Sequence, residues 1–312
     1  MNGQNIQNID ISNIKNKILK LKKENDICIL AHSYQTRDIC DVADYTGDSF
    51  GLSVNAAKTS RKTLLMCGVR FMAETAKMLS PRKKVILANP HAGCPMADNL
   101  TKEDVLKAKK LHPGYAVACY INTTADVKTV CDVCVTSSSA VKILENYDSD
   151  SFIFVPDKNL GSYVQAKLPN KNFVFVEGCC PIHNALTKEI ALAAKQAHPD
   201  ALFLVHPECR PEVVEIADYV GSTTGIMDFA RKSGAKKFLI ATENEIASHL
   251  SDEMPEKEFI SPSPLLYCPN MKRTSIEDVF AAVSGNGGLE IDLDGDTIRK
   301  AVNCINEMIE FG

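Results

Sequence analysis

Short apolar runs recur along the chain and alternate with segments in which apolar residues follow helical spacing. Runs of three to five apolar residues, typical of buried parallel strands, stand at 27–31, 63–66, 84–87, 115–119, 152–155, 173–176, 201–205 and 238–240. Helical spacing lies between them, for example over 71–79 and 226–232, and at both ends, over residues 1 to about 25 and after about 285. Strands that alternate with helices predict parallel sheets in an α/β fold.

A repeat of about 86 residues underlies this alternation. The pattern Cys-Pro, then Leu-Thr-Lys-Glu, then His-Pro begins at Cys94 and again, 86 positions later, at Cys180. A fainter third copy begins at Cys268, where Ser275 takes the place of the Thr. In each copy a Ser or Thr precedes acidic residues and an apolar periodic run, which indicates the start of a helix. Each of the three Cys is therefore predicted in a loop just before a helix.

The repeat divides the 312 residues more naturally into three units than into one long sheet. We expect an α/β protein of three homologous three-layer α/β/α domains, whose parallel sheets are arranged around a pseudo-threefold axis. The predicted boundaries are 1–93 for the first domain, 94–179 for the second and 180–284 for the third, with 285–312 completing the first.

Composition excludes several classes of protein. The 35 Lys and Arg against 39 Asp and Glu give a net charge of −4, which predicts neither a nucleic-acid nor a membrane partner. No apolar run is long enough to cross a membrane, and residues 1–5 lack the basic region and apolar core of a signal peptide. These features predict a cytoplasmic protein, in which the 12 Cys do not form a disulfide framework.

Polar side chains gather where the predicted strands end. Ligands of open α/β sheets bind at the carboxyl ends of the strands, so these residues are candidates for function. Hydroxyls and backbone amides at helix starts suit carboxylate or phosphate groups, although each taken alone can also be a helix cap. The segments after the first strand of each unit are 32–34, 120–123 and 206–209, and those after the next strand-like position are 47–49, 136–139 and 221–224.

Three strand-end loops pointing inward would bring Cys94, Cys180 and Cys268 together. Three thiolates suggest a metal, because zinc held by three ligands keeps one position open and an iron–sulfur cluster held by three Cys keeps one iron available. The residues alone leave zinc and iron–sulfur open, and three buried structural Cys are the plain alternative. Cys131 and Cys134 form a separate C-x-x-C, which we interpret as structural in preference to redox-active.

Several segments resemble the quinolinate synthase family, the A proteins of bacterial NAD biosynthesis. The resemblance runs from about residue 28 to 285 and rests on CGVRFMAETAK (67–77), AGC (92–94), VHPEC (205–209), GST (221–223), ATENE (241–245) and CPNMK (268–272). It implies three homologous α/β domains and a transferase that condenses iminoaspartate with dihydroxyacetone phosphate to give quinolinate, phosphate and water. It also implies small-molecule substrates and leaves room for transient contact with the enzyme that supplies iminoaspartate.

The resemblance also implies a cofactor and site residues. The cofactor is one [4Fe-4S] cluster per chain, with Cys94, Cys180 and Cys268 as ligands and one open iron as Lewis acid, which agrees with the repeat and selects iron over zinc. For proton transfer, the candidates are Tyr34, Tyr120, Glu208, His32 and His206, because His and Tyr shuttle protons and Glu can act as a base. The substrate cavity is implied to be lined by His32, Tyr34, Ser49, Tyr120, Asn122, Ser137, His206, Glu208, Ser222 and Thr223.

The chain departs from the family in one segment. Some members carry a C-x-x-C-x-x-C run that ends at the position of Cys268, but here Pro262 and Leu265 replace the earlier Cys, so a redox switch is not expected there. Two alternatives are a metal-storing or redox-sensing binding protein and a zinc-dependent lyase or hydrolase. The polar residues at the strand ends favour an enzyme over a binding protein.

Overall fold

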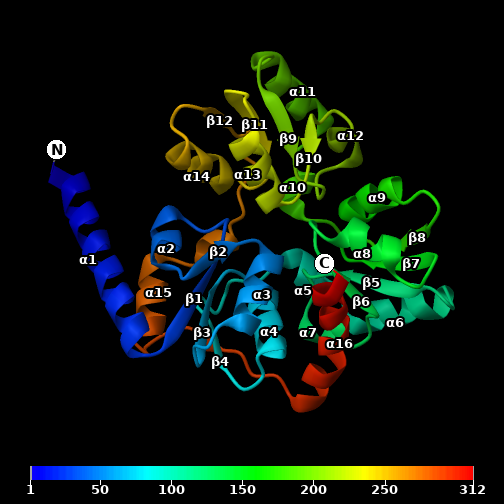
Figure 1. The fold of residues 1–312 in the computed structure, drawn as a ribbon, viewed down its shortest axis with the longest axis horizontal. Coiled ribbons are helices and arrows are strands. Elements are labelled where there is room, and N and C mark those ends of the chain that lie inside the picture. Colours follow the sequence, from blue (N-terminus) through cyan, green and yellow to red (C-terminus); the bar gives the residue numbers. More distant parts are fainter. Residues whose placement is uncertain (1, 312) are drawn as a thin grey trace. The chain divides into compact units, whose positions relative to one another are not determined.

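The protein is an α/β structure with three sheets, each flanked by helices (Figure 1). The structure, a computed structural model, describes residues 2–311. Contacts divide the chain into two compact units. We call residues 1–94 with 269–298 unit 1, and residues 95–268 with 299–312 unit 2. Three parallel-sheet blocks with surrounding helices confirm the predicted fold class.

Unit 1 contains one sheet, in the order β13-β4-β3-β1-β2. Its strands are β1 (Ile27–His32), β2 (Tyr45–Gly47), β3 (Thr63–Cys67), β4 (Lys84–Leu87) and the antiparallel edge strand β13 (Leu289–Glu290). Its helices are α1 (Asn2–Glu24), α2 (Arg37–Val42), α3 (Ser49–Lys58), α4 (Arg70–Leu79), the 3₁₀ helix η1 (Met271–Arg273) and α15 (Ile276–Val283). Helix α1 packs along α15, and buried residues such as Ile18, Ile29 and Val279 form the core between helices and sheet.

Unit 2 contains two parallel sheets, ordered β6-β5-β7-β8 and β10-β9-β11-β12. The first has β5 (Ala116–Tyr120), β6 (Val133–Val135), β7 (Ser151–Val155) and β8 (Asn172–Phe175), and the second has β9 (Leu202–Val205), β10 (Tyr219–Val220), β11 (Lys237–Ala241) and β12 (Glu258–Ile260). The accompanying helices are α5 (Pro95–Asn99), α6 (Lys102–Leu111), α7 (Ala125–Lys128), α8 (Ala140–Asn146), α9 (Lys158–Lys167), α10 (Pro181–Asn184), α11 (Lys188–Ala197), α12 (Pro211–Val214), α13 (Thr223–Lys232) and α14 (Glu245–Glu253). Helix α16 (Gly295–Phe311) begins among the residues of unit 1 and ends among those of unit 2.

The three sheets share one strand order. Counted along the chain, the first four strands of each block lie in the order second, first, third, fourth, and all of these neighbours are parallel. This common topology gives the sequence repeat a structural counterpart.

The repeat extends to side-chain hydrogen bonds. In every block an Asp that precedes the second strand accepts a hydrogen bond from a backbone N–H of the first strand, and a Lys of the preceding helix reaches the same carboxylate. The Asp acceptors and backbone donors are Asp44 with Ile29, Asp132 with Val117 and Asp218 with Phe203. The lysines are Lys22, Lys109 and Lys195. We call this arrangement the Lys–Asp device, and it occurs at the equivalent position of all three sheets.

The expected strands and helix starts are confirmed. All eight predicted strands are present, with ends within about one residue of the expected positions. The hydroxyl oxygens of Thr101, Thr187 and Ser275 accept hydrogen bonds from the backbone N–H three residues later, so each caps a helix as predicted. Cys94, Cys180 and Cys268 stand directly before α5, α10 and the turn that leads into η1.

The carboxyl-terminal segment is divided between the two units. Strand β13 joins the sheet of unit 1, whereas residues 299–312 group with unit 2. The division into three domains at 93/94 and 179/180 and the pseudo-threefold axis stay predictions. A search of residues 2–311 found no helix whose length and apolar character would suit a membrane span.

Candidate functional site

The strand order of each sheet marks where a ligand site is expected. Between the first and third strands of a block the chain changes direction across the sheet, and crevices of α/β proteins open at the carboxyl ends of such neighbours. In unit 2 these neighbours are β5 with β7 and β9 with β11. The residues that follow them therefore form the candidate active site.

Glu208 lies at the centre of the buried polar groups that follow β9. Its side chain is almost fully buried, and its Oε2 lies 3.0 Å from Nδ1 of His183 and 3.3 Å from Nδ1 of His206. Tyr120, the last residue of β5, also hydrogen-bonds to this carboxylate. The Oε1 atom of Glu208 is buried and has no hydrogen-bond partner among the described residues.

The two imidazole rings beside Glu208 are stacked, with centroids 4.6 Å apart. Nδ1 of His206 also lies 3.3 Å from the backbone nitrogen of Glu208. Nδ1 of His183 faces the carboxylate and also lies 3.3 Å from Sγ of Cys180, and its Nε2 lies 3.0 Å from the Thr242 hydroxyl oxygen. Both histidines thus turn Nδ1 towards the Glu208 carboxylate.

These contacts set the charge of Glu208. Burial raises the pKa of its carboxyl group, but the charges of His183 and His206 and the hydrogen bonds from His183 and Tyr120 outweigh burial, so the pKa lies below its ordinary value. Glu208 is therefore a carboxylate at neutral pH. A buried carboxylate with one unpartnered oxygen is suited to accept a proton or to bind a cation.

Two further buried carboxylates hold the Cys loops of unit 2. The backbone N–H of Cys180 donates to Oδ2 of Asp157, at 3.0 Å, and that of Cys268 donates to Oε1 of Glu243, at 3.3 Å. Asp157 follows β7 and Glu243 follows β11, so the two occupy equivalent positions in their blocks. Burial, and then the charge of Glu208, raises the pKa of Asp157 well above its ordinary value.

A group of three possible metal-binding side chains lies at the Cys180 loop. The Sγ of Cys180, a ring nitrogen of His183 and a carboxylate oxygen of Glu208 all lie within 4.8 Å of one another. Sulfur, imidazole and carboxylate donors suit zinc or iron more than magnesium or calcium. The structure therefore contains a group compatible with a metal cofactor.

The other predicted residues of unit 2 also follow strands. The Oδ1 of Asn122, after β5, lacks a hydrogen-bond partner within residues 2–311 although it is buried. Ser137 is half-buried in the turn between β6 and α8. Ser222 caps α13 through its hydroxyl oxygen, which accepts from the N–H of Gly225, and buried Thr223 is the first residue of that helix. The capping role expected as the alternative for Ser222 is thus present.

The predicted residues of unit 1 follow β1 and β2. His32 is buried at the end of β1, its ring stands edge-on to that of Tyr34 at 4.4 Å, and its Nδ1 accepts from the Tyr34 N–H. Lys272 donates to the Tyr34 carbonyl oxygen. Ser49 begins α3, and Cys94 is half-buried. The meeting of these residues with those of unit 2, and of Cys94 with the other two Cys, stays a prediction.

Four residues of the buried polar group were not anticipated from the sequence: His183, Asp157, Thr242 and Glu243. A signal for His183 exists, since it lies three residues after Cys180 at the start of a short helix. The other three follow the third strand of their blocks, a position that the pattern of first and second strands left out.

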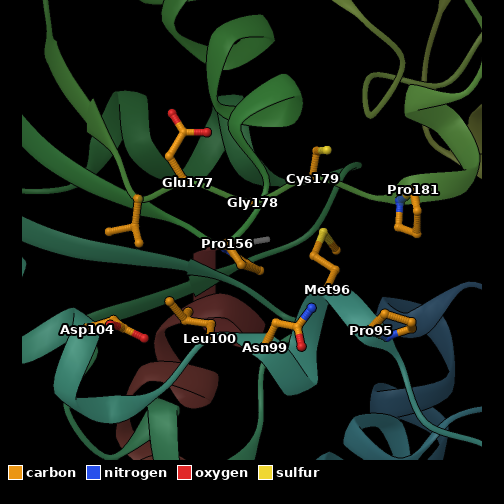
Figure 2. Close-up of a pocket in the computed structure, with 11 residues that line it drawn as sticks. Pro95, Met96, Asn99, Leu100, Asp104, Pro156, Glu177, Gly178, Cys179 and Pro181 are labelled. Atoms are coloured by element: carbon orange, nitrogen blue, oxygen red, sulfur yellow. The ribbon is translucent and has the colours of Figure 1, made fainter.

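A cavity of about 510 Å³ lies beside the Cys180 loop (Figure 2). Cys179 and Pro181, on either side of Cys180, line it together with residues of α5 such as Met96 and Asn99. The side chain of Glu177 points away from Asn99 in this view. None of the predicted substrate-binding residues lines the cavity, so it adjoins the predicted site without defining it.

Comparison with known proteins identifies the family. The family model described as "Quinolinate synthetase A protein" matches residues 16–310. A quinolinate synthase from Caldicellulosiruptor saccharolyticus is 47% identical over 303 residues, covering 97% of this chain and 100% of its own. Those from Clostridium novyi and Geobacter metallireducens are 48% and 49% identical over 296 residues, covering 95% of this chain and 98% and 97% of theirs. The chain belongs to the quinolinate synthase family.

Proposed function

We propose that this chain is a transferase that condenses iminoaspartate with dihydroxyacetone phosphate to give quinolinate, phosphate and water in NAD biosynthesis. The observation that carries the proposal is the buried carboxylate of Glu208, with Tyr120 and two histidines around it and one oxygen left without a partner. Condensation and dehydration both need groups that accept and return protons, and this group supplies them. The predicted cytoplasmic location accompanies the proposal and stays a prediction.

The proposed cofactor is one [4Fe-4S] cluster held by Cys94, Cys180 and Cys268. The donor set fits, because all three are half-buried thiols and soft thiolates suit such clusters. The unpartnered Oε1 of Glu208, near Cys180, also fits a cationic group at this position. When bound, a cluster with three Cys ligands leaves one iron free to act as a Lewis acid.

The chain's own residues are assigned as follows. Glu208 accepts a proton from the substrate carbon or nitrogen, and Tyr120, hydrogen-bonded to it, returns a proton to a departing hydroxyl. His206 holds Glu208 in place, and His32 orients Tyr34, the second proposed proton donor. Asn122, Ser49, Ser137, Ser222 and Thr223 are proposed to bind the substrate carboxylates and phosphate through hydroxyl, amide and helix-start N–H groups.

The substrates are small molecules, and the proposal includes no nucleic-acid or membrane partner. Iminoaspartate hydrolyses readily, since imines react with water. Transient contact with the enzyme that supplies it is therefore part of the proposal.

Metal analysis tests the proposal. The chain is purified without oxygen, and iron, sulfide and zinc are measured with the absorption spectrum for the unaltered chain and for Cys94→Ala, Cys180→Ala and Cys268→Ala. We expect about four iron and four sulfide per chain, lost in all three variants. Cys209→Ala is the matched control, because Cys209 is a fully buried thiol of unit 2 and should leave the iron content unchanged.

Two outcomes would overturn the assignment. Stoichiometric zinc in place of iron would favour a zinc-dependent enzyme that uses the Cys180, His183 and Glu208 group. Full iron content in any of the three variants would remove that Cys from the ligand set. If the cluster is present, an assay with iminoaspartate and dihydroxyacetone phosphate then tests the reaction, and absence of quinolinate would overturn the proposed function.

A further inference from the structure

Three cysteines of unit 2 gather around a fourth, and none of the four has a part in the proposed cluster. Cys119 lies in β5, Cys134 in β6, Cys131 in the turn before β6 and Cys304 in α16. Cys119, Cys134 and Cys304 are fully buried, and Cys131 is partly exposed. The side chain of Cys119 hydrogen-bonds with each of the other three thiols. We call these residues the thiol cluster.

The thiols of the C-x-x-C do not interact primarily with each other. Cys131 and Cys134 each hydrogen-bond to Cys119, which stands outside the motif and is the direct neighbour of Cys134 in the parallel ladder of β5 and β6. A dithiol built from this motif alone would therefore be the wrong interpretation. The central sulfur belongs to Cys119.

A buried ammonium lies beside the thiol cluster. Lys128 is fully buried, and its Nζ donates to the carbonyl oxygens of Ile121 and Thr123 and to the Thr123 hydroxyl oxygen. All three acceptors are neutral, so among the described residues no carboxylate is paired with this charge. A buried cation with neutral partners favours an anion nearby.

Cys119 is the thiol best placed to be that anion. The hydrogen bonds from Cys131, Cys134 and Cys304 lower the pKa of Cys119 well below its ordinary value, and the charge of Lys128 lowers it further, against the effect of burial. The same hydrogen bond raises the pKa of Cys131, so that Cys131 keeps its proton. A thiolate beside neutral thiols is the arrangement from which disulfides form.

We infer that Cys119 and Cys131 form a peroxide-responsive dithiol that hydrogen peroxide converts into a disulfide. Cys131 is the partner because it is partly exposed and lies outside the strands and helices, whereas Cys134 is held in a paired strand and Cys304 in a helix.

The reaction balances without any other reagent. The Cys119 thiolate attacks one peroxide oxygen, the O–O bond breaks, and hydroxide leaves and takes up a proton to become water. The sulfur of Cys131 then attacks the resulting sulfenic acid, the S–O bond breaks, the S–S bond forms and a second water leaves. Two thiols lose two electrons and two protons, and one hydrogen peroxide is reduced to two waters.

Peptide mapping of the full chain tests the inference independently of the proposed cluster. The protein is treated with hydrogen peroxide, free thiols are alkylated in denaturant, and tryptic peptides are analysed by mass spectrometry. Cleavage after lysine separates Cys119, in 111–128, from Cys131 and Cys134, in 129–142. We expect a disulfide-linked pair of these peptides, and fragmentation should place the bond on Cys131. The peroxide dose is one at which Cys28, a buried thiol outside the thiol cluster, is still alkylated.

Cys131→Ser and Cys134→Ser are matched variants from the same motif. We expect at least tenfold less linked peptide in Cys131→Ser and an unchanged amount in Cys134→Ser. Fragmentation of the unaltered chain assigns the bond even if a variant fails to fold. Three outcomes would each overturn the inference. The bond could be placed on Cys134, or no linked peptide could form at a dose that oxidises Cys28. The chain could also contain stoichiometric zinc that prevents linkage and is lost in Cys119→Ser.

Discussion

Asp157 and Glu243 each accept a hydrogen bond from the backbone of a Cys that is proposed to hold the cluster. Replacing Asp157 by Asn puts an amide N–H₂ or a weaker acceptor opposite the Cys180 N–H. An unsatisfied buried donor costs about 1–3 kcal/mol. We expect Asp157→Asn to lower the free energy of unfolding by about this amount and to lower the iron content, and Glu243→Gln to do the same through Cys268. Urea titration and iron analysis measure both effects.

Glu177→Gln is the control for these two variants. Glu177 lies in the loop that contains Cys180, but its side chain is 86% exposed. Its ion pair with Lys158 is a surface pair, so the expected change in stability is below about 1 kcal/mol. Full iron content in both Asp157→Asn and Glu243→Gln would show that these carboxylates do not position the Cys loops.

At the scale of residues, the sequence predicts the members of a site better than their partners. Tyr120 and Glu208 could be found because they directly follow apolar runs, and they are hydrogen-bonded to each other. Asp157 could not, because its Oδ1 caps α9 as an Asp before a helix normally does, while its Oδ2 holds the distant Cys180 backbone. The sequence does not distinguish an Asp that only caps a helix from an Asp that also accepts a hydrogen bond from a distant loop.

The Lys–Asp device that each block repeats provides a test at the scale of elements. Lys22 is 7% exposed and donates both to Asp44 and to the Val42 carbonyl oxygen, whereas Lys195 is 30% exposed. Lys22→Met leaves buried acceptors without a donor, and we expect a loss of about 1–3 kcal/mol in the free energy of unfolding. The equivalent Lys195→Met removes a more exposed pair and should cost about 1 kcal/mol or less. Urea unfolding measures the difference, and equal losses would contradict the role of burial.

The elements that the sequence predicts are those with a strong apolar signal. Runs such as Phe152–Val155 are buried on both faces of a parallel sheet, so every residue is apolar and the strand is visible. The strands β2, β6, β10, β12 and β13 have two or three residues each, too few for a periodic pattern. They are held by backbone pairing with a longer neighbour, which depends on the tertiary structure.

At the scale of the whole molecule, the repeat predicts the blocks but does not predict which block the chain end completes. Repeated motifs report the common topology, and all three sheets share it. The carboxyl-terminal segment stands outside the repeat, so its place depends on which core its apolar residues fit. Residues 269–298 group with unit 1 and 299–312 with unit 2, and completion of the first domain by 285–312 stays a prediction.

The end of α16 should therefore stabilise unit 2. Ala301, Cys304, Ile305 and Met308 recur at helical spacing and are fully buried, whereas Ile309, next to Met308, is 36% exposed. Ile305→Ala removes buried methyl groups and leaves a cavity, at an expected cost of about 2–5 kcal/mol. Ile309→Ala, the same substitution on the exposed side, should cost about 1 kcal/mol or less. Urea unfolding measures both variants, and similar losses would mean that the helix end does not pack as a core element of unit 2.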